Sequence, residues 1–256
     1  MSSIVISGAS RGLGAELARG WAGPGVALHL IGRDAVALEG VAADCRARGA
    51  LVHTALLDVR DAPALSAQVL AWDNASPFTL VVANAGVTGG TRPDGSMEGH
   101  DSTLRVLGVN LTGAVNLVEP LLPRLVARGA GRLVLVCSVA AFRGLPDSPA
   151  YSASKAGLWA YGEALRALLA LRGVGVTMVA PGFFRSEMSA RFKGGHPFEY
   201  SVEAAGAKIR RAVARGAGRC VFPWGFGMML RLLELMPAPV ADKLTRLFRF
   251  RVDIQP

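Results

Sequence analysis

The chain has 256 residues, of which 51% are apolar and 18% are charged, so it can bury a full-sized core and is not a disordered chain. Its three cysteines are too few and too scattered for a disulfide scaffold, which favours a reducing compartment, and its four histidines show no metal-ligand spacing. The net charge is +9, and residues 191–256 hold most of the excess, with 12 lysines and arginines against 5 acidic residues. Anionic small molecules, acidic lipid headgroups or an acidic partner would suit this charge. No zinc-finger or RNA-recognition signature accompanies it, so no nucleic-acid partner is expected.

The first ten residues, MSSIVISGAS, contain neither a basic region nor a long apolar stretch, so no signal peptide is expected. No window of about eighteen consecutive apolar residues follows, and the sequence therefore predicts no transmembrane helix. These features together predict a cytoplasmic protein.

Short runs rich in valine, isoleucine and leucine alternate with longer helical patterns. Strands are expected over residues 4–7, 26–31, 51–57, 79–83, 132–137, 174–180 and 219–222, and helices from the first glycine turn to about residue 20 and over 35–48, 62–72, 102–128 and 151–171. Strands that are apolar throughout and joined by helix-length connections indicate a parallel sheet covered on both faces. The predicted fold is α/β, a single Rossmann-type, doubly wound parallel sheet of about seven strands, with ligands at the carboxyl ends of the strands. We predict one domain over residues 1–256, in which residues 186–256 form a substrate lid and a basic amphipathic C-terminal extension.

The first predicted strand leads directly into a glycine-rich loop with the spacing G-x-x-x-G-x-G. Glycines let the backbone turn sharply and approach a pyrophosphate, whose charge faces the amino terminus of the following helix. A tight turn that serves only packing is the alternative explanation. The strand–loop–helix context favours a dinucleotide site, and the residues expected to bind it are Gly8, Ser10, Arg11, Gly12, Leu13 and Gly14.

The second predicted strand ends at Gly32, Arg33 and Asp34, where a dinucleotide-binding fold meets the adenosine ribose. An acidic residue at this tip would bind the ribose hydroxyls of NAD, whereas an arginine would meet the 2′-phosphate of NADP. Arg33 and Arg11 can converge on that phosphate through bidentate hydrogen bonds. The sequence therefore predicts NADP(H), and Asp34 keeps NAD(H) as the alternative.

Three polar residues form a candidate catalytic group. Tyr151 and Lys155 are four residues apart near the start of a strong helical pattern, so both project from one face of that helix. Ser138 follows the predicted strand 132–137, at the edge where a parallel sheet presents its chemistry. Each residue has an ordinary structural explanation when taken alone, but their combination with the glycine loop predicts an active site.

These motifs resemble those of the short-chain dehydrogenase/reductase family over nearly the whole chain to about residue 188. The resemblance implies that Asn110, Ser138, Tyr151 and Lys155 form a catalytic tetrad. It also implies contacts with the cofactor from a larger set of residues, namely Asp58, Val59, Asn84, Ala85, Gly86, Tyr151, Lys155, Pro181, Gly182, Phe184 and Ser186.

Within that set, the resemblance assigns Asp58 to the adenine amino group, residues 84–86 to the adenosine side, and Ser186 to the nicotinamide carboxamide. Two residues depart from the family pattern. Ser7 stands where the family usually has threonine, and Ala83 replaces the first asparagine of the common Asn-Asn-Ala-Gly segment.

Carbonyl reduction needs a hydride donor beside the carbon and an acid that protonates the developing alkoxide. A phenol with a pKa near 10 is a poor proton relay at neutral pH. We therefore expect the Lys155 ammonium, with the positive charge of an oxidised nicotinamide, to lower the pKa of Tyr151; a fall of roughly three pH units needs about 4 kcal/mol of interaction. Ser138 is expected to orient the substrate oxygen, and Asn110 to hold a water that passes protons through Lys155.

Three stretches are expected around the nicotinamide: residues 87–100, residues 139–150 and the segment after Pro181. Their aromatic and apolar residues predict either a lipophilic ketone or alcohol substrate or a lid that packs on the core. The members named for this lining are Phe142, Leu145, Phe183, Phe184, Met188, Phe192, Phe198 and Tyr200.

Residues 221–251 combine an apolar segment with a second helical pattern, in which Val240, Leu244, Leu247 and Phe248 share one face. A homodimer or homotetramer interface, or a flap over the substrate cleft, is one interpretation. A peripheral membrane contact is the other, because basic and apolar faces side by side suit anionic lipid surfaces.

The predicted function is an NADP(H)-dependent oxidoreductase that interconverts a small-molecule carbonyl and an alcohol. A non-catalytic dinucleotide sensor or scaffold of the same fold is the alternative, although such a protein would normally have lost Tyr151 or Lys155. An epimerase or dehydratase that reuses both residues is a further alternative.

Overall fold

The computed structural model describes residues 2–92, 94–185, 189, 192–193, 199–245 and 251–252, with the backbone alone for 192–193 and 251–252. The predicted site residue Ser186 lies outside the described residues, as do Met188, Phe198, Leu247 and Phe248.

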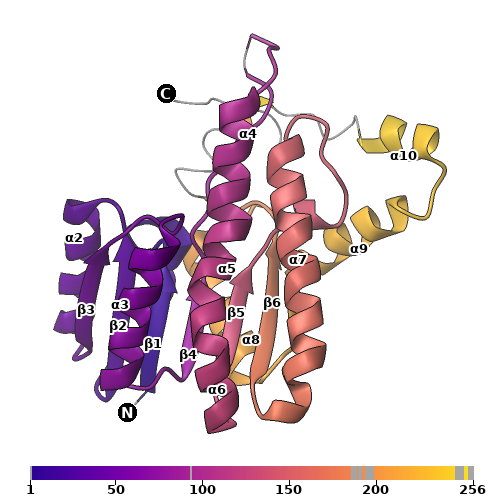
Figure 1. Cartoon of the computed structure of the whole chain (residues 1–256). Coiled ribbons are helices and arrows are strands. Elements are labelled where there is room, and N and C mark those ends of the chain that lie inside the picture. The colour runs from indigo at the N-terminus through magenta and orange to yellow at the C-terminus, as the bar shows by residue number, and fades with distance from the viewer. Residues whose placement is uncertain are drawn as a thin grey trace.

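Seven parallel strands form the central sheet, in the order β3-β2-β1-β4-β5-β6-β8 (Figure 1). This order confirms the predicted doubly wound α/β fold. The strands are β1 (Ser2–Ser7), β2 (Val26–Gly32), β3 (Leu51–Leu56), β4 (Leu80–Ala83), β5 (Arg132–Val136), β6 (Gly175–Pro181) and β8 (Arg219–Phe222).

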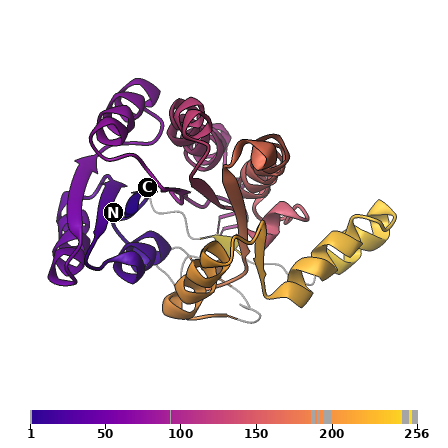
Figure 2. The same cartoon turned by 90° about the horizontal axis from the view of Figure 1, so that it is seen from below.

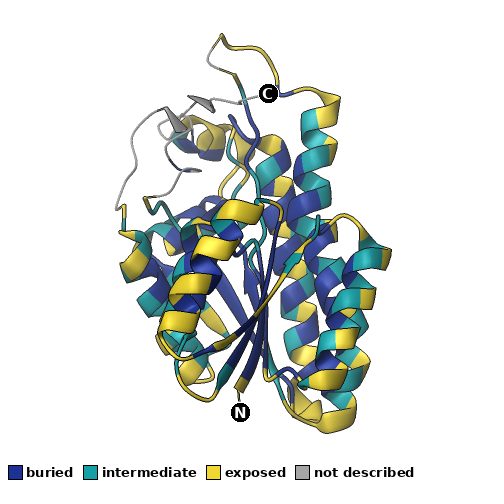
Figure 3. Cartoon of the chain, turned by 90° about the vertical axis from the view of Figure 1, so that its left-hand side faces the viewer, coloured by how far each residue is buried: buried dark blue, intermediate teal, exposed yellow. Residues whose placement is uncertain are grey.

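Successive side chains of the inner strands pack alternately into two separate hydrophobic clusters. Val5, Val81 and Leu133 enter the cluster on one face of the sheet, whereas Ile6 and Val82 enter the other. This alternation follows from the two-residue period of a strand, and it explains why apolar residues occupy successive positions of these strands and not only every second one. Figure 3 shows the inner strands largely buried and exposed residues on the outer sides of the helices, whereas the edge strand β3 is mostly exposed.

One layer of helices contributes to the cluster of Ile6 and Val82, and a second layer covers the opposite face (Figure 2). The first layer consists of α1 (Gly12–Trp21), α2 (Ala35–Ala47) and α8 (Val202–Ala214). The second consists of α3 (Ala62–Ala75), α5 (Gly113–Val118), α6 (Leu122–Arg128) and α7 (Pro149–Leu169). Helix α4 (His100–Leu107) precedes this layer in the chain and packs against α7.

The predicted single helix over residues 102–128 is interrupted twice. A π-helical turn, Gly108–Thr112, separates α4 from α5, and a 3₁₀ turn, Glu119–Leu121, separates α5 from α6. Pro120 and Pro123 lie at the second interruption, where they remove backbone donors.

The same run, His100–Arg128, is long and apolar enough to cross a membrane by length and composition, which the search for consecutive apolar residues did not reveal. Its most apolar window is 44% buried within the protein. Val109, Leu117 and Leu125 from this run are part of the larger hydrophobic cluster, as expected of a core helix.

The C-terminal part adds α9 (Trp224–Leu233) and α10 (Ala238–Thr245), which project beside β8 (Figures 1 and 2). A short antiparallel pair, β7 (Phe192–Lys193) with β9 (Arg251–Val252), lies outside the main sheet. Of the predicted apolar face of the last helical pattern, Val240 is exposed and Leu244 packs against the larger cluster.

Candidate functional site

A cleft of about 600 Å³ lies at the carboxyl ends of the central strands. It is lined by most of the residues that the sequence predicted: Gly8, Ser10, Arg11, Gly12, Leu13, Arg33, Asp58, Val59, Asn84, Ala85, Gly86, Ser138, Tyr151, Lys155, Pro181, Gly182 and Phe184. Gly14 and Asn110 do not line it. The lining also includes Gly32 and Asp34 from the tip of β2, and Val87 and Thr88 from the stretch expected around the nicotinamide. The lining residues that the sequence analysis did not single out are Ile31, Leu57, Arg105, Val109, Val136 and Cys137.

The glycine loop between β1 and α1 is shaped for a ligand that approaches its backbone. Gly8 and Gly12 have φ values of +67° and +54°, which a residue with a Cβ rarely adopts. A Cβ on Gly8 would also lie 2.7 Å from the Cα of Ala85, and one on Gly14 would overlap the Gly8 carbonyl oxygen. Gly14 therefore serves the packing of α1 against the loop.

Hydrogen bonds from the residues that follow β4 hold this loop in place. The Asn84 side chain donates to the carbonyl oxygens of Ser7 and Gly8, at 3.0 and 3.1 Å. The Ser7 hydroxyl oxygen accepts from the backbone N–H groups of Asn84 and Ala85, so serine supplies the hydroxyl at this position. The Ser10 hydroxyl is buried in the loop and has no hydrogen-bond partner among the described residues, which fits a loop that offers donors to a phosphate.

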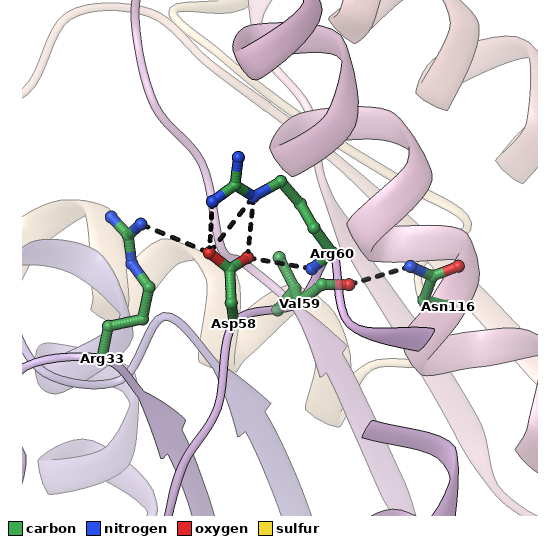
Figure 4. Close-up of polar contacts among 5 residues, drawn as sticks. All are labelled: Arg33, Asp58, Val59, Arg60 and Asn116. Carbon is green, nitrogen blue, oxygen red and sulfur yellow. Dashed lines mark hydrogen bonds and ion pairs between the residues drawn. The ribbon is translucent and has the colours of Figure 1, made fainter. Parts of the chain in front are cut away.

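The end of the cleft where the adenosine is expected, which we call the adenosine end, contains a network of ion pairs (Figure 4). Arg60 Nη2 lies 2.7 Å from Asp58 Oδ2, and Arg33 Nη1 lies 3.4 Å from the same oxygen. The hydrogen bonds from Arg60 lower the pKa of Asp58 to about 2. Asn116 donates to the carbonyl oxygen of Val59 at 2.9 Å and so anchors this segment to α5. Asp58 is thus a fixed, charged acceptor beside Arg33.

The acidic residue that kept NAD(H) as an alternative is already bonded within the chain. Asp34 caps α2 by accepting from the backbone N–H of Ala37 at 3.0 Å, and Arg11 Nη2 donates to its other oxygen at 2.9 Å. These bonds compete with any ribose hydroxyl for the Asp34 carboxylate. Arg11 and Arg33 both remain more than half exposed, with side-chain exposures of 55% and 62%.

Tyr151, Lys155 and Ser138 meet at the other end of the cleft. Lys155 is 4% exposed, and its Nζ donates to the carbonyl oxygen of Val136 at 2.9 Å. The same Nζ lies 5.8 Å from the centre of the Tyr151 ring. Ser138 caps the 3₁₀ turn after β5 by accepting from Ala140 N–H at 3.2 Å.

Burial controls the ionisation of this group. It raises the pKa of Tyr151 to about 12, and a hydrogen bond with Ser138 offsets only part of that effect. Burial also lowers the pKa of Lys155. In the chain alone, therefore, the pKa of Tyr151 is raised, because burial removes the phenolate from water. The expected lowering includes the charge of a bound oxidised nicotinamide and stays a prediction.

Asn110 lies in the π-helical turn and is fully buried. Its amide donates to Val87 O and to Ser154 Oγ, both at 3.0 Å, and its oxygen accepts from Val87 N–H at 2.7 Å. Both amide hydrogens are therefore engaged in fixing the segment after β4 against α7. The Asn110 side chain therefore has no free N–H group with which to hold the predicted water.

Glu98 is a contributor that the sequence analysis missed. It is 6% exposed, and its Oε1 accepts from the backbone N–H of Ala150 at 3.1 Å, one residue before Tyr151. The N-cap residue of α7, Ser148, makes no side-chain cap bond, so Glu98 satisfies a donor of this first turn from 52 residues away. No local motif announces a cap supplied from so far along the chain.

The expected aromatic lining is only partly present. Phe184 lines the cleft. Phe142, however, packs edge-on against Trp159 at 4.8 Å between ring centres, below the guanidinium of Arg231. Tyr200 packs against Phe222 on the other side of the sheet. The prediction that Phe142 belongs to the nicotinamide surround is wrong, because its ring is taken up by the core under α9.

Comparisons with known proteins identify the family of the chain. The family model described as short chain dehydrogenase matches residues 2–195. An uncharacterized oxidoreductase from Myxococcus xanthus is 36% identical over 248 residues, which is 96% of this chain and 97% of the relative. Among solved structures, a short-chain dehydrogenase from Sphingobium yanoikuyae in complex with NADPH has a TM-score of 0.78 at 24% identity, covering 88% of this chain and 89% of its own. A single-substitution variant of the actinorhodin polyketide ketoreductase with NADPH has a TM-score of 0.77 at 25% identity, covering 88% and 97%. The chain therefore belongs to the short-chain dehydrogenase family and is an oxidoreductase of that family.

Proposed function

We propose that this protein is an NADP(H)-dependent oxidoreductase that interconverts a small-molecule ketone or aldehyde and the corresponding alcohol. The observation that carries the proposal is that Tyr151, Lys155 and Ser138 line the same cleft as the glycine loop. One continuous cleft can then hold a dinucleotide along its length and a substrate at its buried end.

The glycine loop and α1 would hold the pyrophosphate. No acidic side chain occupies the first turn of α1, so the free N–H groups there meet an anion without competition. The unpartnered Ser10 hydroxyl adds a donor at the same place.

The choice of NADP(H) rests on the charges at the adenosine end. Arg11 and Arg33 flank the tip of β2, and Asp34 is neutralised by Arg11. A 2′-phosphate would gain two guanidinium partners, whereas the ribose hydroxyls of NAD would compete with Arg11 and with the α2 cap for Asp34. The solved neighbours bind either kind of cofactor, since one is a complex with NADPH and another with NAD.

A bound nicotinamide supplies or accepts the hydride. The chain must then move a proton to or from the substrate oxygen, and Tyr151 Oη is the group assigned to this step. Because burial keeps Tyr151 protonated, it suits the donor role in carbonyl reduction. Ser138 donates a hydrogen bond to the same substrate oxygen and so fixes its position next to the phenol.

Lys155 acts on Tyr151 by its charge. An ammonium in a dry site stabilises the phenolate that forms when Tyr151 gives up its proton. The contact with Val136 O fixes the ammonium in the cleft, where Lys155 would also hold the ribose of a bound nicotinamide.

The proposal is tested with a panel of ketones, aldehydes and secondary alcohols, with NADPH or NADH as hydride donor and the absorbance of the reduced nicotinamide as readout. We expect turnover of a lipophilic carbonyl with NADPH, and none by a Tyr151→Phe protein used as the blank. Turnover of no compound, or equal turnover in the blank, would contradict the oxidoreductase assignment. A lower KM for NADH than for NADPH would contradict the cofactor assignment alone.

The assembly as a homodimer or homotetramer and the cytoplasmic location remain predictions, as does the division into one catalytic domain with residues 186–256 as lid and extension. Light scattering on the full chain measures the oligomeric state. Its outcome also bears on the surface described next.

A further inference from the structure

A second hollow of about 610 Å³ lies outside the cleft, between α8, β8 and α9. Five of its lining residues are cations, and we call them the basic groove: Lys208, Arg211, Arg215, Arg219 and Arg231. Among the residues that the structure describes, no acidic side chain lines this hollow. The remainder of the lining is largely apolar and includes Phe142, Trp224 and Met228.

Most of the charge in the basic groove is uncompensated. Arg219 is paired with Glu163. Within the part of the chain that the structure describes, no carboxylate pairs with the other four. Lys208 lies over the Tyr200 ring at 5.2 Å, and Arg231 lies over the Phe142 ring at 4.2 Å. Four like charges on one surface favour a ligand or partner surface that is anionic.

The helix beside the groove is apolar on both of its faces. One face of α9 is buried through Gly227, Leu230 and Leu233. The opposite face carries Trp224 and Leu232, which are 67% and 52% exposed, and Met228 between them, which is 37% exposed. These three follow one another at four-residue spacing and so form a stripe along the helix, which we call the α9 stripe. Apart from Arg231, α9 is thus apolar on two opposite faces, and a helix of this kind is normally buried, so the α9 stripe implies a covering surface.

We propose that the basic groove and the α9 stripe together dock the protein on an anionic lipid membrane. Cations next to an exposed apolar helix face, with a tryptophan among its residues, are the features that bind an acidic bilayer interface. Lipid phosphates would meet Lys208, Arg211 and Arg215, while Trp224, Met228 and Leu232 would enter the boundary with the acyl chains.

The shape and the charge favour a membrane over a second copy of the chain. Figures 1 and 2 show α9 and α10 projecting away from the sheet beyond β8, where an extended surface can reach them. A two-fold contact would place the same patch of both copies face to face. That arrangement would bring together two sets of uncompensated cations, whereas a bilayer with anionic headgroups supplies the missing charge.

The test is flotation of the full chain with vesicles of phosphatidylcholine alone or with about 30% phosphatidylglycerol, at about 0.1 M salt, where the Debye length is about 10 Å. We expect partitioning onto the anionic vesicles at least about tenfold above that onto the neutral ones, and its loss at about 1 M salt. Arg211→Glu with Arg215→Glu should reduce the partitioning about tenfold or more, and so should Trp224→Ser with Met228→Ser.

Matched controls come from the turn after α7, whose residues line neither the basic groove nor the α9 stripe. Arg172→Glu and Leu171→Ser change an exposed cation and a 99% exposed leucine after α7, and neither should alter the partitioning. The near-ultraviolet circular dichroism of each variant shows that it is folded. A blue shift of tryptophan emission on anionic vesicles, absent from Trp224→Phe, would place that side chain in the lipid.

Wild-type protein that does not float with anionic vesicles, or that floats equally with neutral ones, overturns the proposal. Control variants that lose binding as strongly as the groove variants also overturn it, because the attraction would then be a property of the net charge. An oligomer that dissociates on Trp224→Ser while vesicles bind nothing would assign the α9 stripe to a second copy instead.

Discussion

The two ends of the cleft contain similar charged groups in opposite surroundings. At the adenosine end, Arg11 and Arg33 are more than half exposed, and they form ion pairs with Asp34 and Asp58. At the catalytic end, Lys155 is 4% exposed and has no carboxylate partner among the described residues. At the open end, therefore, the charged side chains are stabilised by ion pairs and water. At the buried end, the Lys155 ammonium is stabilised by a backbone carbonyl with little water around it.

Because of this difference in exposure, the pKa shifts favour the charged form of the titratable group at the open end and disfavour it at the buried end. Pairing with Arg60 lowers the pKa of Asp58 and keeps it ionised at the open end. Burial raises the pKa of Tyr151 and lowers that of Lys155, so both shifts at the closed end disfavour the charged form. Substitutions at the closed end should thus change the rate of the chemical step, and those at the open end should change cofactor affinity.

The largest effect is expected from Lys155→Met. It removes the cation that stabilises the Tyr151 phenolate, so kcat for carbonyl reduction should fall by about 10³-fold, within the range for a lost acid–base contribution. Lys155→Arg should not restore the rate, because the larger guanidinium does not fit a site with 4% exposure. Steady-state kinetics measure both variants. If Lys155→Met kept activity within about tenfold of the wild type, the closed end would not control the chemical step, and this contrast with the open end would be wrong.

The pH dependence of kcat for reduction should report the closed end. The reaction needs Tyr151 and Lys155 both protonated, and burial raises the pKa of Tyr151 to about 12 while it lowers the pKa of Lys155 from 10.5. As pH rises, Lys155 loses its proton first. The rate should therefore be constant near neutral pH and then fall about tenfold per pH unit, from an inflection below 10.5. An inflection above that value would contradict the assignment to a buried lysine.

At the open end, Arg33→Ala should raise the KM for NADPH about tenfold, equivalent to about 1.4 kcal/mol, because one of two guanidinium partners of the 2′-phosphate is lost. The kcat, and the KM for NADH, should not change. Arg172→Ala, on the surface after α7, is the matched control and should leave both constants as they are. A fall in kcat with unchanged KM would place Arg33 outside the adenosine end.

The smallest effect is on stability, through Asp58→Asn. The pKa of Asp58 is lower in the folded chain, at about 2, than its ordinary value of 3.8, so its ion pairs stabilise the fold above pH 3.8 and this contribution is lost as pH falls toward 2. Because Arg33 and Arg60 are largely exposed, we expect a loss of about 1 kcal/mol in the free energy of unfolding at neutral pH. Urea denaturation of both proteins at neutral pH and near pH 2 measures it. A difference that persists unchanged at the lower pH would show that the ion pairs are not its cause.

The strands and the residues after them could be predicted from sequence because their signals are local. Apolar runs placed every strand of the main sheet to within two residues, and motifs located Ser138, Tyr151 and Lys155 in one cleft. Ser2 and Ser3 were missed as part of β1 because their hydroxyls bond to the Ser76–Thr79 segment, a contact between distant parts of the chain.

The features of the site that could not be predicted from the sequence depend on partners far along the chain or on the exclusion of solvent. The cap that Glu98 provides for α7 joins residues 52 positions apart. The engagement of the Asn110 amide with Val87 and Ser154 requires the π-helical turn, which no residue pattern announced. The direction of the Tyr151 shift in pKa depends on how much water the fold excludes, whereas the sequence showed only that a lysine was near.

The most direct test of the closed end is a Tyr151→Phe protein assayed for both NADPH binding and carbonyl reduction. Phenylalanine keeps the ring that lines the cleft and removes only the hydroxyl that transfers the proton. The predicted result is wild-type affinity for NADPH, measured by nicotinamide fluorescence, with turnover reduced by about 10³-fold or more. Turnover close to that of the wild type would contradict the role assigned to Tyr151 and, with it, the proposed chemistry of the cleft.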